Sequence, residues 1–278
     1  MDVLFLKRFI KNKFTIVGSI ILLVFFLTAI FGPFFLTHDP NHINLLNIYQ
    51  HPDRVHIFGT DNLGRDTFAR IVVGARVTLL VSFIATAVGS LVGAALGVIA
   101  GYFGGAIDAL ISRGVEILLA FPSLLLGIVI VAILGSGLEN TIGAIAILSI
   151  PIIARMVRSV VISIKDLEYV QASQVMGASH SRIILTHIVP NAMSQIIVNT
   201  TLNLGMAILI ASSLSFLGLG VTPPHPEWGA MLVVGREMIR HFPLAAIIPG
   251  TAITLVVLSF SIVGDGLRDA LDPKLKNK

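Results

Sequence analysis

Long apolar runs with almost no charge set the limits on what this chain can fold into. Six of them are long enough to cross a bilayer, whose hydrocarbon core of about 30 Å takes about 20 helical residues. Inside lipid, every backbone polar group must be bonded within the protein, so such runs favour helices. The sequence therefore predicts an all-α, polytopic membrane protein with six transmembrane helices, at roughly residues 14–36, 77–101, 115–135, 140–161, 192–218 and 243–264.

Basic residues in the segments between the runs indicate how the chain is oriented. Thirteen of the 19 Lys and Arg fall on the side of the N-terminus and six on the other side. Cytoplasmic segments of membrane proteins carry the excess of Lys and Arg. We therefore predict that both termini and the polar segment 162–190 are cytoplasmic, and that segments 37–76 and 219–242 lie outside. The first run is too long for a cleavable signal segment, so we expect it to be retained.

Several classes of protein are excluded by what the sequence lacks. It holds no cysteine, which excludes thiol catalysis and disulfides. It holds no Gly-Lys pair, so the phosphate-binding loop of an ATPase is absent. A secondary transporter or channel needs ionisable groups or a polar filter within its spans, and we assign none there. This class is therefore the alternative hypothesis and not the favoured one. The net charge of +4 is spread among the loops, and no nucleic-acid partner is predicted.

Five glycines recur at every fourth position, a spacing that keeps them on one face of a helix. Small residues on such a face let a second helix approach closely inside a membrane. The pattern therefore predicts a tight helix–helix contact along Gly89, Gly93, Gly97, Gly101 and Gly105.

The 162–190 segment reads as two short helices. Asp166 is predicted to cap a first helix over 167–176, and Gly177 suits the left-handed position that ends it. Ser179 is predicted to cap the second helix and Pro190 to stop it, with the fifth span beginning at the next residue.

One face of the first short helix is apolar and exposed to a partner. Tyr169, Ala172 and Met176 share this face, at i, i+3 and i+7. A groove in another protein and the headgroup layer of the membrane both suit such a face, and the residues alone leave the two alternatives open.

This segment resembles the cytoplasmic coupling loop of ABC importer permeases. The family pattern is Glu-Ala-Ala, then a glycine four residues later and a proline thirteen residues after that. Gln171-Ala172-Ser173, Gly177 and Pro190 meet both spacings, with Gln and Ser in place of Glu and the last Ala. Glu168 lies one turn before Gln171.

Other motifs are similar to those of the C-type permease of dipeptide, oligopeptide and nickel importers. The similarity extends over about residues 15 to 273. The motifs are Gly59-Thr-Asp-Asn-Leu-Gly-Arg-Asp66, Gly74-Ala-Arg76, Gly101-Tyr-Phe-Gly-Gly105, Phe121-Pro122, Ser213-Leu-Ser-Phe-Leu-Gly-Leu-Gly220, Pro224-His-Pro-Glu-Trp-Gly229 and Gly264-Asp-Gly-Leu-Arg-Asp-Ala-Leu-Asp-Pro273.

The resemblance implies a type I ABC importer permease fold in a bacterial inner membrane. It implies three kinds of protein partner besides membrane lipid: a second, different permease subunit, two ATP-binding subunits, and an extracytoplasmic solute-binding protein. ATP and magnesium would be bound by the partner subunits, so this chain is not expected to be an enzyme by itself. A short peptide is the expected solute, with nickel or a metal chelate as the alternative.

The resemblance also assigns roles to parts of this chain. Residues 1–76 hold the first span and the outer segment, 77–264 the permease core with five spans, and 265–278 a cytoplasmic tail. The implied ATPase-contacting residues are Glu168, Tyr169, Gln171, Ala172, Ser173, Met176, Gly177 and Pro190.

Three polar groups outside that loop are candidates for a functional site. The outer motif of Gly59, Asp61, Gly64, Arg65 and Asp66 can hold turns together through caps and an ion pair, or dock the solute-binding protein. Four polar residues of the fifth span are possible pore-lining residues: Asn199, Asn203, Ser212 and Ser213. The histidines of the outer segment have no spacing that fixes a metal geometry, so no metal site is predicted at His38, His42, His51 or His56.

Overall fold

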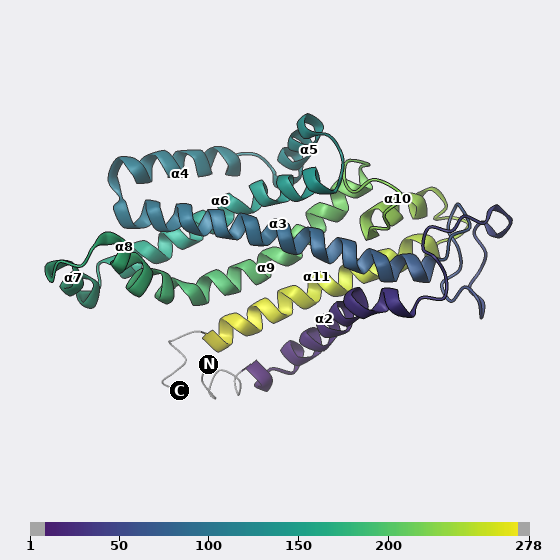
Figure 1. The fold of residues 1–278 in the computed structure, drawn as a ribbon, viewed down its shortest axis with the longest axis horizontal. Helices are drawn as coiled ribbons and strands as arrows, with labels where there is room; N and C mark the ends of the chain where they lie inside the picture. Colours follow the sequence, from purple (N-terminus) through teal and green to yellow (C-terminus); the bar gives the residue numbers. More distant parts are fainter. Residues whose placement is uncertain (1–8, 272–278) are drawn as a thin grey trace.

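The computed structural model describes residues 9–271, so residues 1–8 and the end of the predicted tail, 272–278, lie outside the described part. Every named element of residues 9–271 is helical (Figure 1). The elements are α2 (Lys13–Phe31), η1 (Gly32–Phe35), η2 (Leu45–Asn47), α3 (Thr67–Phe103), α4 (Gly105–Leu119), α5 (Ser123–Leu134), α6 (Leu138–Lys165), α7 (Glu168–Val175), α8 (His180–Ile183), the π-helical η3 (Ile184–Ile188), α9 (Val189–Phe216), α10 (Trp228–Glu237) and α11 (Leu244–Leu271).

Five helical stretches are long and apolar enough to cross a membrane, and each contains most or all of one predicted span. They are Lys13–Phe35, Thr67–Phe103, Leu138–Lys165, His180–Phe216 and Leu244–Leu271. A sixth span exists if α4 and α5, which meet at an angle of 93°, count as one broken span.

The third predicted span, 115–135, is divided between two helices. Its first half belongs to α4, which already begins at Gly105, and its second half is α5. The break falls at Phe121-Pro122, because a proline disfavours the helical conformation of the residue before it. The chain turns again at Gly135, which has φ of +93°.

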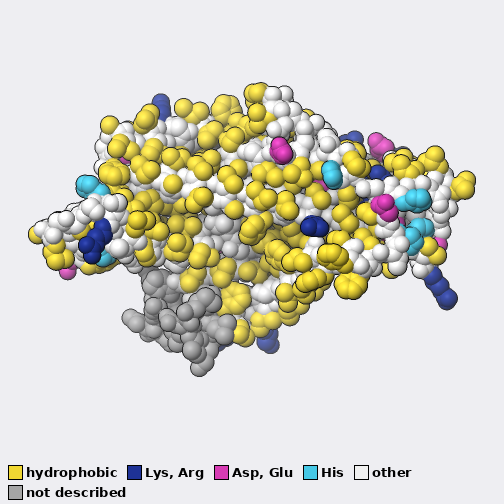
Figure 2. Space-filling view, viewed as in Figure 1, with side chains coloured by type: hydrophobic (Ala, Val, Ile, Leu, Met, Phe, Trp, Pro, Cys, Tyr) yellow, Lys and Arg dark blue, Asp and Glu magenta, His cyan; other side chains and the backbone are white. Residues whose placement is uncertain are grey.

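The long helices run side by side, with polar segments at the two ends (Figure 1). The segment between η1 and α3 lies at one end together with α10, and α7 and α8 lie at the other. The start of α2 and the end of α11 point toward the α7 end, as expected for termini on the same side as that loop. Hydrophobic side chains cover most of the face drawn in Figure 2, as a lipid-embedded bundle requires.

The predicted glycine contact is confirmed between α3 and α6. A Cβ added at Gly89, Gly93 or Gly97 would lie 2.6–2.7 Å from a carbonyl oxygen of α6, and one at Gly101 would lie 2.8 Å from Val161 Cβ. Gly105 does not take part, because α3 ends at Phe103 and nothing lies within 4 Å of a Cβ there. Four glycines thus bring the two backbones into direct contact.

Candidate functional site

One side of α7 is anchored to the membrane helices. Val170 is fully buried in a cluster with Val161 of α6 and Ile183 of α8. Ser173 is also buried; its Oγ donates to the carbonyl oxygen of Tyr169 at 3.0 Å and lies 3.1 Å from Nε2 of His187. Ser173 therefore faces the loop interior, whereas the other predicted contact residues of α7 are exposed.

The start of α7 differs from the prediction and its end agrees with it. Leu167, not Asp166, is the N-cap residue, and Asp166 contributes only its backbone carbonyl, which accepts from Gln171 Nε2 at 3.2 Å. At the other end Gly177 has φ of +80°, the left-handed conformation that glycine adopts at little cost. Its N–H donates to Gln174, and the N–H of Ala178 donates to Ser173, which closes the helix as a Schellman motif.

The outward side of α7 is apolar and accessible. Val175 and Met176 are 89% and 79% exposed, and Tyr169 is half-exposed with its ring 5.8 Å from the ring of His187. Ala172 lies exposed between them, so the predicted face is present, and Val175 enlarges it.

The chain after α7 is more continuous than predicted. Ser179 caps α8 as expected, accepting from the N–H of Arg182 at 3.4 Å. Pro190 does not stop a helix; it lies in the first turn of α9, directly after the π-helical turn η3. The π turn bonds Val189 N–H to Ile184, and the Asn191 side chain donates to the carbonyl of His187 at 2.6 Å, so the helix passes the proline.

At the opposite end, the outer motif forms a closed set of bonds. The Asp61 carboxylate accepts from the backbone N–H of Leu63 and Arg65 at 2.9 and 3.0 Å, and pairs with Arg65 Nε at 2.7 Å. Arg70 Nε lies 3.4 Å from the same carboxylate. Asp61, Arg65 and Arg70 are all buried, so this part of the motif holds the fold together.

The remaining residues of the motif fix the entry to α3. Asp66 caps α3 by accepting from Ala69 N–H at 2.6 Å, and its other oxygen lies 2.8 Å from His56 Nδ1. Gly59 and Gly64 have φ of +72° and +69°. A Cβ at Gly64 would overlap the carbonyl oxygen of Asn44, so no other residue fits. The predicted caps and the ion pair are therefore present.

Comparison with known proteins identifies this arrangement. The model of the binding-protein-dependent transport system inner membrane component matches residues 93–277, and that of the N-terminal TM domain of oligopeptide transport permease C matches residues 3–52. The dipeptide transport system permease protein DppC of Alkalihalophilus pseudofirmus is 51% identical over 271 residues, 98% of this chain and 89% of the relative.

The chain belongs to the ABC importer permease family.

Further relatives of this permease agree with that assignment. The glutathione transport system permease protein GsiD of Pectobacterium atrosepticum is 42% identical over 98% of the permease and 91% of the relative. The solved MetNI methionine ABC transporter, in an inward-facing conformation, is 21% identical, with a TM-score of 0.61 over 74% of the permease and 98% of that chain. An amino acid ABC transporter gives a TM-score of 0.55 at 17% identity. The solved structures establish the fold, and the permease is a multi-pass inner-membrane component of an importer.

Two of the possible pore-lining residues are buried inside the permease. Asn203 and Ser212 are 7% and 5% exposed, and neither Asn203 Nδ2 nor Ser212 Oγ has a partner in the described residues. Asn199 and Ser213 are partly accessible, and their side chains donate to the carbonyl oxygens of Gln195 and Leu209.

The outer histidines do not form a set of metal ligands. His38 and His56 stack with ring centroids 5.2 Å apart, and His51 packs against Phe242. Within residues 9–271, no group of three or more His, Cys, Asp or Glu could hold a metal ion.

Sequence reasoning missed two charges of the permease, the buried Glu227 and the exposed Arg155. Glu227 is 1% exposed; it caps α10 through Ala230 N–H and accepts from Thr78 Oγ1 of α3 at 3.3 Å. Burial raises the pKa of this carboxyl above its ordinary value. Arg155 was counted with the cytoplasmic loop charges, although α6 continues to Lys165. Its position inside the predicted span 140–161 could have marked Arg155 as a charge within the membrane.

Proposed function

We propose that this permease forms half of the translocation path of an ATP-driven importer of short peptides. A second, different permease subunit forms the other half, and an extracytoplasmic solute-binding protein delivers the peptide to the outer side. Two ATP-binding subunits, which hold ATP and magnesium, bind the cytoplasmic loop. The 51% identity to a dipeptide permease over nearly the whole chain supports the choice of solute.

The exposed apolar face of α7 is the observation that carries this proposal. α7 has eight residues, a single charge at Glu168, and no Lys or Arg. Helices that lie on membrane headgroups are typically rich in Lys and Arg, so this face fits a groove in a partner protein better than a lipid surface. Its other side is anchored through Val170 and Ser173, so a force on α7 reaches α6 and α9.

Two measurements on cells with and without this gene test the proposal. Uptake of a labelled dipeptide is expected to fall when the gene is deleted, while uptake of labelled nickel stays unchanged. Loss of nickel uptake alone would replace the peptide by a metal as the solute. Loss of neither would contradict the proposed solute class.

Co-purification tests the proposed partners separately from the solute. The tagged permease is expected to bring down two ATP-binding subunits and a second permease. If it purifies without any ATP-binding protein under conditions that keep the bundle folded, the proposed coupling through α7 is wrong.

A further inference from the structure

The two arginines in the cytoplasmic half of α6 are bonded differently. Arg158 donates from Nη2 to Asp108 Oδ2 at 2.6 Å and from Nε to the other oxygen of the same carboxylate. Asp108 belongs to α4 and also accepts from Ser112 at 3.0 Å. The side chain of Arg155 makes no hydrogen bond or ion pair with any of the residues described here.

Arg155 lies deep along a membrane-spanning helix. At 1.5 Å per residue it is about 26 Å from the outer end of α6, at Leu138, and about 15 Å from the cytoplasmic end, at Lys165. If α6 crosses a hydrocarbon core of about 30 Å, Arg155 lies in the cytoplasmic half of that core. A charge at such depth is costly unless it faces water or an opposite charge, so it marks a functional position.

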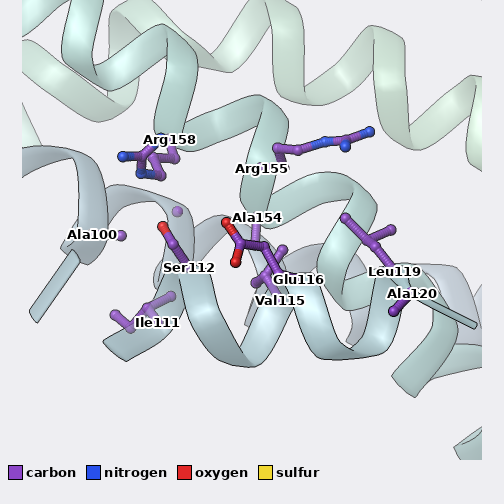
Figure 3. Close-up of a pocket in the computed structure, with 11 residues that line it drawn as sticks. Ala100, Ile111, Ser112, Val115, Glu116, Leu119, Ala120, Ala154, Arg155 and Arg158 are labelled. Carbon is purple, nitrogen blue, oxygen red and sulfur yellow. The ribbon is translucent and has the colours of Figure 1, made fainter. Parts of the chain in front are cut away.

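Arg155 lines a cavity of about 340 Å³ between α3, α4 and α6 (Figure 3). This volume is at the lower end of the range of small-molecule sites, about 300–1,000 Å³. Gly97, Ala100 and Ala154 leave the space open on one side, and Val115 and Leu119 of α4 give it an apolar wall.

The same cavity is lined by a carboxylate that has only a weak ion pair. Glu116 of α4 lines the cavity, and its closest cation is Arg113, at 3.5 Å, with both side chains largely exposed. Exposed pairs of this kind contribute little free energy. The cavity thus presents one unpaired cation and one weakly paired anion, from different helices.

We propose that this cavity binds a short peptide as it crosses the membrane, with Arg155 holding the α-carboxylate and Glu116 the α-ammonium group. The proposal rests on the peptide-importer function proposed above. The fork of an arginine matches a carboxylate, and Arg158 does not compete because Asp108 already neutralises it. An acidic side chain of the second permease subunit could neutralise Arg155, but it would leave Glu116 with only its exposed pair to Arg113. A short peptide brings both charges.

Competition binding to the purified four-subunit importer, without its solute-binding protein, tests this assignment. The probe is radiolabelled dialanine, and the competitors are dialanine, its C-terminal amide and its N-acetyl derivative. Dialanine is expected to compete at least ten-fold better than either derivative with the wild-type complex. In Arg155→Gln the preference over the amide disappears and the preference over the N-acetyl derivative remains, whereas Glu116→Gln shows the reverse. Arg155→Lys keeps part of the preference.

The pattern of loss separates recognition from damage to the fold. A structural defect would weaken all three competitors together, whereas recognition predicts that each variant loses one terminus only. Arg240→Gln, an exposed arginine at the outer end, is the matched control and keeps both preferences. If both cavity variants keep both preferences, or the wild type shows none, the assignment is wrong.

Two further readouts separate this inference from the proposals on which it rests. Wild-type proteoliposomes supplied with the solute-binding protein should take up dialanine when ATP is present. If they do not, both the proposed solute and the peptide site at Arg155 and Glu116 are wrong. If they do, a failed binding test contradicts the peptide site alone. Loss of the second permease from the purified Arg155→Gln complex would show that the arginine pairs with that subunit, and would also overturn the assignment.

Discussion

The part of the outer segment before α3, residues 37–66, and the part of the cytoplasmic loop after α6, residues 166–190, are both polar, yet they are bonded differently. In the outer segment the charged side chains Asp61, Arg65 and Asp66 are buried and bonded to one another or to backbone N–H groups. In the cytoplasmic loop the apolar side chains Val175 and Met176 point outward. The first region pairs its buried charges internally, and the second leaves a surface for another molecule.

This contrast separates a scaffold from a contact surface within one chain. A region whose buried charges are paired resists substitution, because removing one partner leaves another buried and unsatisfied. Where apolar side chains are exposed to water, a substitution changes the stability of the chain little. It can greatly weaken the binding of a partner that covers those side chains. The following predictions test this contrast, in order of their expected effect on stability.

Gly64→Ala and Gly177→Ala place the same methyl group at two glycines with positive φ. At Gly64 the methyl group meets the carbonyl of Asn44, and we expect a loss of about 4 kcal/mol. At Gly177 nothing lies within 4 Å, and only the backbone strain of about 1 kcal/mol remains. Thermal melting of the purified importer measures both. Equal losses of stability in the two variants would contradict the difference between the outer segment and the cytoplasmic loop.

Asp61→Asn removes the negative charge that faces Arg65 and Arg70. Both arginines are buried, so we expect a loss of about 3 kcal/mol or more. Asp53→Asn, at an exposed carboxylate of the same segment, is the matched control and is expected to cost much less. Melting temperature and yield of both variants report the difference, and a stable Asp61→Asn protein would contradict the scaffold interpretation.

Ser173→Ala removes the hydroxyl that bonds to Tyr169 and lies near His187. We expect a loss of about 1 kcal/mol, because one hydrogen bond is lost and the ring of His187 can turn to water. Hydrogen exchange of the α7 amides should rise while the exchange of α3 stays unchanged. An increase over the whole bundle would mean that the loop supports the fold more than its contacts suggest.

Lowering the pH acts on the outer segment through Asp53. The backbone N–H of His56, which donates to this carboxylate, holds the pKa of Asp53 below its ordinary value. The contribution to stability is therefore complete above the unfolded-state pKa and is lost as the pH falls through the folded-state pKa. In Asp53→Asn this part of the acid dependence of the melting temperature should vanish. An unchanged acid profile would assign it to other carboxylates.

Ala172→Glu is expected to leave stability nearly unchanged and to abolish uptake. Ala172 is exposed on α7, so a larger charged side chain meets water in the isolated permease and disturbs the proposed contact with the ATP-binding subunit. Membrane insertion and melting should match the wild type, whereas ATP-driven dipeptide uptake should fall at least ten-fold. Gln174→Glu, an exposed neighbour outside the predicted face, serves as the control. Normal uptake in Ala172→Glu would end the proposal that this face couples the subunits.

Features set by local chemistry could be predicted from the sequence. The left-handed Gly177, the cap at Ser179 and the glycine spacing along α3 depend on residues within a few positions of each other. The continuation past Pro190 was misjudged, because a proline can either end a helix or be absorbed by a neighbouring turn. The inward side of Ser173 and the burial of Glu227 depend on helices far away in the sequence, which no local rule describes.

The direct backbone contact between α3 and α6 has a mechanical consequence. Helices separated by side chains can slide when those side chains repack, but at Gly89, Gly93 and Gly97 there is no such layer. The pair therefore behaves as one stiff beam about as long as α6, roughly 42 Å at 1.5 Å per residue. A displacement of α7 at the cytoplasmic end therefore moves the turn around Gly135 at the outer end. The α3–α6 pair couples motions on the two sides of the membrane.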